Sequence, residues 1–520
     1  MSAILPAPDI PRLEIYLSFI PRLGIYLSSL LGLLILLFFY LVHTYAKLRH
    51  IPGPFLAAFT DFVRRSWVLT GNVHLIHTEL HRRYGKVVRT GPNSVLVSDP
   101  NAIPEICGFN AKFPKSEFYD AIMPRVKGKQ IPDVFATRDE NVHRMMKKPN
   151  SAIYSMSNLV SFEPYVNSTM EYYFSRLDEL FVDKDRPFDF GLWLHLFAFD
   201  VMGEITFSRR LGFLEKGGDV GGVMENNWKY FVQAAPATQM PWLDFLWKRN
   251  PLLPASVKPN PLVEFGVARI QERLQMTEQE REKINSRDFL SRFIEAKEKD
   301  PQLGPDTLPT WTNSNIQAGS DTIAIFLGVV FYHLLKNPST LQRLLSEIDS
   351  AAKEGLISKT VTWKESRNLV YLDACIKEAA RIHPPISFPL ERIVPEPGLT
   401  LDGGRYYLPG GTRVLMNPWS VHRDEQMFDK DPDVWRPERW LCDEQQKKAM
   451  YNGLLTFGAG HRSCLGKNIS YLEIYKLIPT LLQRYEIELA DPNAEWHVET
   501  MWFTMPTKFY AKLRRRKQQS

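Results

Sequence analysis

The hydrophobic positions of this chain gather in long stretches near the N-terminus, in the middle and near the C-terminus. The first stretch, residues 24–42, contains no charged residue and consists mostly of Leu, Ile, Phe and Tyr. As a helix it would be about 28 Å long, close to the thickness of a bilayer core. The stretches at 311–335 and 469–482 lie within polar surroundings. We expect a membrane-spanning helix at the first stretch and helices at the other two.

Weaker periodic patterns predict further helices from about residue 140 onward. Apolar residues recur at helical spacing across 341–348, with a proline before them and a glycine after them. Thr362 and Glu365 form a capping-box pattern ahead of an apolar helix face at 372–379. These patterns predict a helix that ends at Gly355 and a capped helix after it.

The predicted β structure is short and lies in two regions. Residues 86–90 and 94–98 read as strands around a Gly-Pro-Asn turn, and 393–414 is a second region rich in short strands and turns. The proline-rich stretch at 251–261 is typical of a surface loop. No low-complexity linker divides the chain. We therefore predict one mainly α-helical domain with a small β portion, covering residues 56–520.

The N-terminal apolar stretch has two interpretations, an uncleaved anchor and a cleaved signal peptide. Its length exceeds a typical signal core, and Pro52-Gly53-Pro54 follows as a rigid stop. We favour the anchor. The predicted order is an N-terminal arm with a short duplication at 1–23, the anchor at 24–42, a hinge at 43–55, and then the main domain.

The bulk composition excludes several classes of protein. The four cysteines among 520 residues are too scattered for a disulfide framework, which favours a reducing compartment and a cytosolic main domain. The net charge of +6 is modest, and no interleaved basic and aromatic run suggests a nucleic-acid partner.

The most informative segment is the loop at 457–466, Phe-Gly-Ala-Gly-His-Arg-Ser-Cys-Leu-Gly, which precedes the last apolar stretch. A thiolate at the mouth of a helix is stabilised by the positive end of the helix dipole and by amide N–H groups. A single cysteine cannot enclose a zinc ion, but it can be the one protein ligand of a haem iron. An ordinary buried cysteine is the alternative.

The pattern Phe-Gly-x-Gly-x-Arg-x-Cys-x-Gly in this loop closely resembles the haem-binding loop of the cytochrome P450 family. The resemblance implies a P450 fold after one transmembrane helix, haem b as cofactor, and Cys464 as its axial iron ligand. Phe457 and Gly466 are the matching loop positions beside the haem. Within the family, the chain looks like fungal microsomal members of the pisatin demethylase type, on segments such as 85–93 and 318–322.

The sequence Ala-Gly-Ser-Asp-Thr at 318–322 interrupts the central apolar stretch. Glycine costs a helix about 1 kcal/mol relative to alanine, so such a cluster is tolerated best where a ligand comes close. A helix kink is the alternative. By resemblance, Asp321 and Thr322 are the acid–threonine pair that lies over the haem and delivers protons during dioxygen cleavage.

Glu378 and Arg381 share one helix face, as ordinary surface pairs often do. The resemblance instead makes them a buried clamp that also binds Arg439, in the segment Trp-Arg-Pro-Glu-Arg-Trp at 435–440. This clamp would support the haem loop rather than catalyse.

The two haem propionates need cations. Arg462 and Arg392 match the family positions, and His143 with Lys147 match a further contact in which the family usually has arginine. The resemblance also places the substrate pocket at 113–123, around Asn315, at 386–388 and at 502–504. These segments are largely apolar, which suits a hydrophobic small molecule.

The resemblance implies a monooxygenase in the endoplasmic reticulum membrane, single-pass, acting in fungal secondary metabolism. Electrons would come from NADPH through a separate NADPH–cytochrome P450 reductase, with cytochrome b5 as a second candidate partner. Two alternatives stay open: a haem-thiolate isomerase or dehydratase that needs no external electrons, and a non-catalytic haem-binding membrane protein.

Overall fold

The computed structural model describes residues 11–126, 129–248, 261–277, 279–280 and 288–517. Its α-helices are α1 (Pro11–Lys47), α2 (Phe62–Leu69), α3 (Val73–Tyr84), α4 (Ile103–Cys107), α5 (Glu140–Ser151), α6 (Met156–Leu159), α7 (Glu163–Leu180), α8 (Phe190–Phe207), α9 (Phe213–Lys216), α10 (Val223–Thr238), α11 (Pro241–Lys248), α12 (Pro261–Gln275), α14 (Phe289–Glu298), α15 (Thr307–Lys336), α16 (Pro338–Lys353), α17 (Trp363–Ser366), α18 (Val370–Ile382), α19 (Pro418–Val421), α20 (Glu425–Phe428), α21 (Glu444–Asn452) and α22 (Lys467–Arg484).

The strands are short and form small sheets beside the helices. They are β1 (Val87–Gly91), β2 (Ser94–Val97), β3 (Arg125–Val126), β4 (Lys129–Gln130), β5 (Phe188–Asp189), β6 (Leu390–Ile393), β7 (Leu399–Leu401), β8 (Tyr406–Leu408), β9 (Arg413–Met416), β10 (Tyr485–Leu489), β11 (Val498–Thr500), β12 (Thr504–Pro506) and β13 (Tyr510–Arg515). The main sheet has the order β1-β2-β9-β6, in which β2 and β9 are parallel and the other pairs antiparallel. The mainly helical fold with a small β portion is confirmed.

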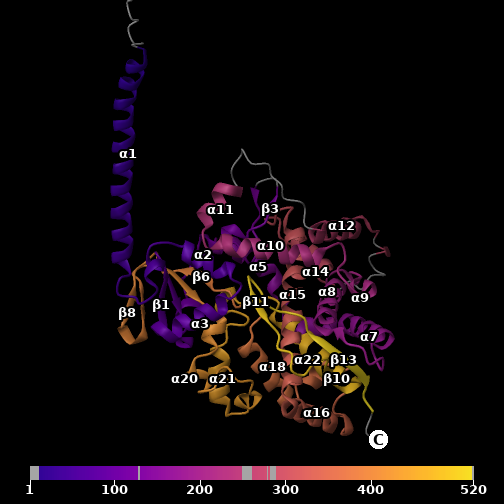
Figure 1. The fold of residues 1–520 in the computed structure, drawn as a ribbon. Coiled ribbons are helices and arrows are strands. Elements are labelled where there is room, and N and C mark those ends of the chain that lie inside the picture. Colours follow the sequence, from indigo (N-terminus) through magenta and orange to yellow (C-terminus); the bar gives the residue numbers. More distant parts are fainter. Residues whose placement is uncertain (1–10, 127–128, 249–260, 278, 281–287, 518–520) are drawn as a thin grey trace, which may run out of the picture.

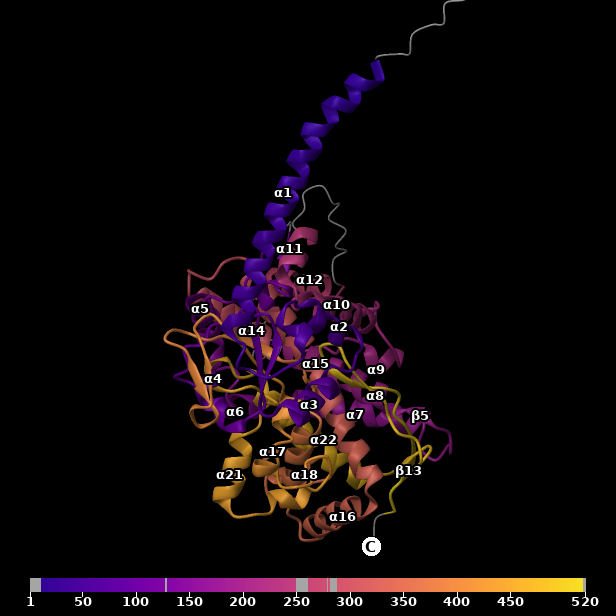
Figure 2. The same cartoon turned by 60° about the vertical axis from the view of Figure 1, so that its left-hand side comes forward.

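Helix α15 runs through the centre of the helical part and packs along α8, α12, α14, α18 and α22 (Figures 1 and 2). Both α8 and α15 are long and apolar enough to cross a membrane, yet 83% and 72% of their most apolar windows are buried inside the protein. Their apolar character is therefore explained by a large hydrophobic core, which these two helices help to build.

The first helix is the exception, because it projects away from the body at one edge (Figures 1 and 2). Its apolar part, Tyr26–Lys47, has a mean hydropathy of 2.1, and its most apolar window has no buried residue. The helix begins at Pro11, so it also includes residues 11–23, which the sequence analysis assigned to an N-terminal arm.

Most element predictions agree with the structure, with one correction. The strands at 86–90 and 94–98 correspond to β1 and β2, and the helix that ends before Gly355 is α16. The capping box at Thr362 and Glu365 exists, but it caps the four-residue helix α17, and the apolar face at 372–379 belongs to the separate helix α18. Residues 251–260 of the proline-rich stretch lie outside the described residues.

Candidate functional site

The cysteine loop is a tight turn between the short helix α21 and the buried helix α22. Gly458 and Gly460 adopt φ values of +64° and +63°, which L side chains rarely adopt. A Cβ on Gly460 would also lie 2.1 Å from the carbonyl oxygen of Cys107, at the end of α4. The Cys464 N–H donates to the Phe457 carbonyl at 2.7 Å and closes the loop. The glycines are thus needed for the turn and for its close contact with α4.

Cys464 lies at the mouth of α22, and its side chain is exposed. Protein surrounds the thiol at longer range, and burial raises its pKa. The backbone N–H groups of Gly466 and Lys467, together with the charges of Lys467 and Lys147, lower the pKa and oppose that effect. Backbone N–H groups that point at a sulfur stabilise its thiolate form. A cation bound beside the sulfur would compensate for the cost of burying the negative charge.

Arg392, on β6, has a buried nitrogen that fits an anion. Its side chain is 9% exposed, and no hydrogen-bond partner for Nη1 exists within the described part of the chain. A buried, unpaired guanidinium N–H is costly unless a ligand satisfies it. Tyr119, whose side chain is fully buried, lies near the charge of Arg392, and its hydroxyl is likewise without a partner among the described residues. Nη1 of Arg392 and the Tyr119 hydroxyl are thus two buried donors without a partner among the described residues.

The other predicted propionate contacts are bonded to the protein itself. Arg462 donates from Nε and Nη2 to Oε1 of Glu140, at 3.2 and 2.8 Å. Lys147 donates to the backbone carbonyl of His461 at 2.5 Å. His143 lies with Nδ1 3.7 Å from Glu140 Oε2, and burial lowers its pKa to about 3, so the ring is neutral at pH 7. The structure brings these side chains together around Glu140, at the N-terminus of α5.

Sequence reasoning missed Glu140, and it placed Lys115 and Tyr119 only within a general pocket segment. Lys115 is 4% exposed, and burial lowers the pKa of its ammonium group well below the usual value. Its backbone pairs with Arg392 as an isolated bridge beside the main sheet. Nothing in the local pattern of the 113–123 segment marks these residues, because their positions depend on β6 and α5, which lie far away in the sequence.

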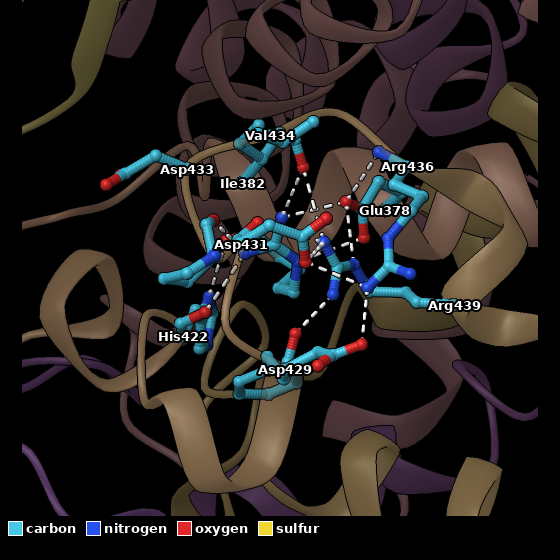
Figure 3. Close-up of polar contacts among 12 residues, drawn as sticks. Glu378, Ile382, His422, Asp429, Asp431, Asp433, Val434, Arg436 and Arg439 are labelled. Carbon is cyan, nitrogen blue, oxygen red and sulfur yellow. Dashed lines mark hydrogen bonds and ion pairs between the residues drawn. The ribbon is translucent and has the colours of Figure 1, made fainter.

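The predicted clamp is present and fully buried (Figure 3). Arg381 donates to both carboxylate oxygens of Glu378, at 2.9 and 2.7 Å, and Arg439 donates to Oε1 at 3.0 Å. Trp440 Nε1 and the Arg436 N–H complete the set of donors, at 2.9 and 3.0 Å. Burial alone would raise the pKa of Glu378, but the hydrogen bonds and charges of the two arginines hold it below its ordinary value.

Two short hydrogen-bonded paths join the clamp helix α18 to the cysteine loop. His422 Nδ1 bonds the Arg381 carbonyl at 3.0 Å, and His422 Nε2 accepts the N–H of Leu455 at 2.7 Å. Burial lowers the pKa of His422 to about 3, so its ring is neutral, with one nitrogen donating and the other accepting. The Thr456 hydroxyl donates to the Ala380 carbonyl at 2.7 Å. Both paths end within two residues of Phe457, where the loop begins.

One face of α15 is directed at the cysteine loop. Ala318, Thr322 and Phe326 are spaced four residues apart, and the ring of Phe326 lies 6.3 Å from the ring of Phe457. Ala318 is exposed and Thr322 half-buried, although the helix runs through the core. The Thr322 hydroxyl donates to the Ala318 carbonyl at 2.7 Å.

Asp321 lies on a different face from Thr322, because neighbouring helix residues are rotated by about 100°. Its buried carboxylate is bonded by His195, on α8, at 2.5 Å and by the amide of Asn227, on α10. The presence of Gly319 is also explained by something other than the nearby ligand that the sequence suggested. A Cβ on Gly319 would lie 2.7 Å from the sulfur of Met202, so the glycine makes room for α8 rather than for a ligand.

Three of the predicted pocket segments meet around one tryptophan. Phe118, Phe388 and Phe231 place their rings 5.5–5.9 Å from that of Trp502. The Ser387 N–H also donates to the Thr504 hydroxyl at 2.9 Å, which ties 386–388 to 502–504.

The polar group of Asn315 does not point into a substrate pocket, as the sequence led us to expect. Its amide donates to the Thr206 hydroxyl at 2.8 Å and accepts the Tyr154 hydroxyl at 3.1 Å, so its polar group is bonded inside the core. Within an apolar helix stretch, the sequence alone does not show which face a neighbouring helix will cover.

Comparison with known proteins identifies the family. The family model for cytochrome P450 matches residues 52–512. The chain is 69% identical to the cytochrome P450 monooxygenase cicH of Emericella nidulans over 470 residues, which cover 90% of this chain and 94% of the relative. It is 51% identical to a cytochrome P450 monooxygenase of Aspergillus terreus (86% of this chain, 92% of the relative) and 44% identical to one of Aspergillus flavus (94% and 96%). The chain belongs to the cytochrome P450 family and is one of its monooxygenases.

Proposed function

We propose that this protein is a membrane-anchored monooxygenase that oxidises a hydrophobic small molecule with dioxygen. Its electrons come from NADPH through a separate reductase, with cytochrome b5 as a second donor. The observation that carries the proposal is the exposed thiol of Cys464 at the mouth of α22, opposite the accessible face of α15 that bears Thr322. Dioxygen chemistry and substrate would meet between these two elements.

The residues present fit the haem that the family implies. Haem supplies an iron whose axial thiolate favours O–O bond cleavage. Cys464 would hold the iron, with Phe457 and Gly466 beside it. The buried, unpaired Nη1 of Arg392 and the Tyr119 hydroxyl are suited to one propionate.

The second propionate would have to compete with a protein carboxylate. Glu140 accepts from Nε and Nη2 of Arg462 and lies 3.3 Å from His461, so a propionate bound here would share Arg462 with Glu140. Lys147 reaches the same region through the His461 carbonyl. We therefore assign the stronger contact to Arg392 and a shared one to Arg462, His143 and Lys147.

Protons would be supplied from α15. The Thr322 hydroxyl faces the cysteine loop and can form a hydrogen bond to an oxygen ligand. Asp321 lies on another face of α15, where its carboxylate is bonded to side chains of α8 and α10. We therefore assign to the Thr322 hydroxyl the role of orienting the oxygen ligand, and to the Asp321 carboxylate the role of supplying protons. A haem-thiolate isomerase would not need such a pair, so turnover that requires NADPH supports the monooxygenase over that alternative.

The aromatic cluster around Trp502 supports an apolar substrate with flat surfaces, because such rings favour offset stacking. The relatives compared above come from filamentous fungi, which supports a role in fungal secondary metabolism. The product of one cycle would be an alcohol or a further oxidised form of the same carbon skeleton.

A position in the endoplasmic reticulum membrane, with the main domain in the cytosol, is supported by two surfaces on one side of the molecule. The apolar part of α1 is exposed along its length, and α11 lies at the end of the body from which α1 projects (Figures 1 and 2). On α11, Trp242, Phe245 and Leu246 are 54%, 48% and 57% exposed. A bilayer would cover both surfaces.

The central test concerns the thiolate. We expect the reduced carbon monoxide complex of the wild type to show the thiolate-type Soret band, and Cys464→Ala to lose it. Cys442→Ala is the matched control, because Cys442 is a half-buried cysteine outside the loop and should leave the band unchanged. A thiolate-type band that survives in Cys464→Ala would refute the assignment.

A further inference from the structure

The carboxylate of Asp321 is held by two helices that sequence reasoning did not connect with it. Oδ1 lies 2.5 Å from Nε2 of His195, on α8, and Oδ2 accepts the amide N–H of Asn227, on α10. Asn227 in turn accepts from the amide of Gln317, one turn before Asp321, at 2.6 Å. Both carboxylate oxygens are therefore bonded by side chains of other helices.

The two partners differ in what they can do chemically. An amide holds a carboxylate in place but does not exchange protons with it near pH 7, and neither would an arginine. An imidazole can both accept and donate a proton in this pH range, through two separate nitrogens. His195 is thus a partner of Asp321 that can orient the carboxylate and also resupply it.

The His195 side chain is also more exposed to solvent than the carboxylate that it contacts. The Asp321 side chain is 6% exposed, and that of His195 is 14% exposed. Phe199, one turn later on α8, covers one side of the ring, with 5.2 Å between the ring centroids. A buried acid that delivers protons repeatedly needs a route by which they are replaced, and the imidazole is a partly exposed group in direct contact with it.

We propose that His195 is the positioning residue of Asp321 and the entry point for its protons. The ring accepts a proton at Nδ1 from a hydronium ion of the solvent, which is left as water, and becomes imidazolium. The Nε2–H bond then breaks, and a carboxyl O–H bond forms at Oδ1 of Asp321, so one proton has moved inward and the ring is neutral again. This proposal rests on the supplying role of Asp321 proposed above.

The test compares His195→Gln, Asp321→Asn and the double variant in full-length protein reconstituted with reductase and NADPH, without added substrate. Glutamine can still donate a hydrogen bond to Asp321 but cannot carry a proton through its side chain. The matched control is His81→Gln, because the His81 ring bonds the Gly85 carbonyl near the end of α3, away from α15.

We expect His195→Gln and Asp321→Asn to slow NADPH oxidation by about tenfold or more, since an aligned proton donor commonly contributes at least that much. Both should release more hydrogen peroxide per NADPH, and the control should match the wild type. The melting temperatures give a readout independent of turnover. The double variant should lose less than the sum of the two single losses, because the residues share one contact.

Three results would contradict the proposal. Wild-type rates in His195→Gln beside slow rates in Asp321→Asn would overturn the proposal and leave the role of Asp321 standing. Wild-type rates in both variants would overturn that role as well. Slow rates in His195→Gln with additive melting losses would also overturn the proposal, because His195 would then act without Asp321.

Discussion

Single residues around the candidate haem site are held by buried charges whose partners come from distant parts of the chain. The carboxylate of Glu378 binds Arg381 from its own helix and Arg439 from a segment 61 residues away. In the same way Glu140 binds Arg462, 322 residues away. The pair of Glu378 and Arg381 is recognisable in sequence only when its motif is already known, because ordinary surface pairs show the same local spacing. The pair of Glu140 and Arg462 has no local spacing at all, and sequence reasoning missed it. Residue identity therefore suggests the chemistry, and the fold supplies the partner.

At this scale we predict that Glu378→Ala destabilises the protein by about 3–5 kcal/mol, because two buried guanidinium groups lose their common carboxylate. We expect little folded, haem-containing protein, measured by chemical unfolding and by the Soret absorbance per mole of protein. Glu438→Gln is the control on the neighbouring segment. Glu438 is 42% exposed and pairs with Arg343 at the surface, so its loss should cost less than about 1 kcal/mol. Equal stability of the two variants would contradict the clamp.

At the scale of elements, each face of helix α15 contacts a different part of the protein. One face packs on α8 so closely that Gly319 is required, a second carries Thr322 toward the cysteine loop, and a third places Asp321 against His195. The cluster at 318–322 was expected to reflect a nearby ligand. For the accessible face at Ala318 and Thr322 that interpretation stays a prediction, whereas Gly319 is explained by its packing on α8. The reason is that residues next to each other in a helix face different neighbours.

Two glycines of α15 should therefore respond in opposite ways to alanine. Gly328→Ala meets no atom within 4 Å and should stabilise the protein by about 1 kcal/mol, through helix propensity. Gly319→Ala gains the same propensity but forces a Cβ against the sulfur of Met202, and overpacking costs about 1–3 kcal/mol. We expect a net loss of stability in urea unfolding.

The Met202→Ala background separates the two contributions of Gly319→Ala. Removal of the sulfur should turn the loss into a gain of stability, measured against Met202→Ala alone. If Gly319→Ala were as stabilising as Gly328→Ala in the wild-type background, α8 would not be packed on this glycine.

For the whole molecule, the apolar surfaces of α1 and α11 share one side, opposite α16 (Figures 1 and 2). The link between α1 and the body is well defined. Lys47 donates to the Asn93 side chain at 3.3 Å, and Leu48 is fully buried. This firm junction would fix the orientation of the body relative to a bilayer, with α11 brought against the same surface.

At this scale we predict that deletion of residues 1–40 weakens membrane binding without abolishing it. Adding the three substitutions Trp242→Ser, Phe245→Ser and Leu246→Ser to this deletion should remove the remaining membrane binding. Each of these side chains would lose about 1.5–3 kcal/mol of apolar burial in the bilayer. Vesicle co-sedimentation measures the bound fraction. Leu356→Ser with Val370→Ser is the control, because both side chains are exposed, at 55% and 59%, outside α1 and α11. Equal binding by the two sets of serine variants would contradict a contact through α11.

The sequence by itself determined the family, the clamp residues and the long apolar helices, including the N-terminal one, and it pointed to Cys464 as the proposed haem ligand. These features depend on local patterns, namely glycine spacing in a loop, apolar periodicity and the length of an uncharged stretch. Only the tertiary structure decided which atoms those residues meet. It paired Arg462 with Glu140 and placed His195 on Asp321. It also turned Asn315 into the core and left one donor each of Arg392 and Tyr119 without a partner in the described part of the chain. Hydrogen bonds and close packing act over a few ångströms between segments far apart in the chain, so no local pattern encodes them.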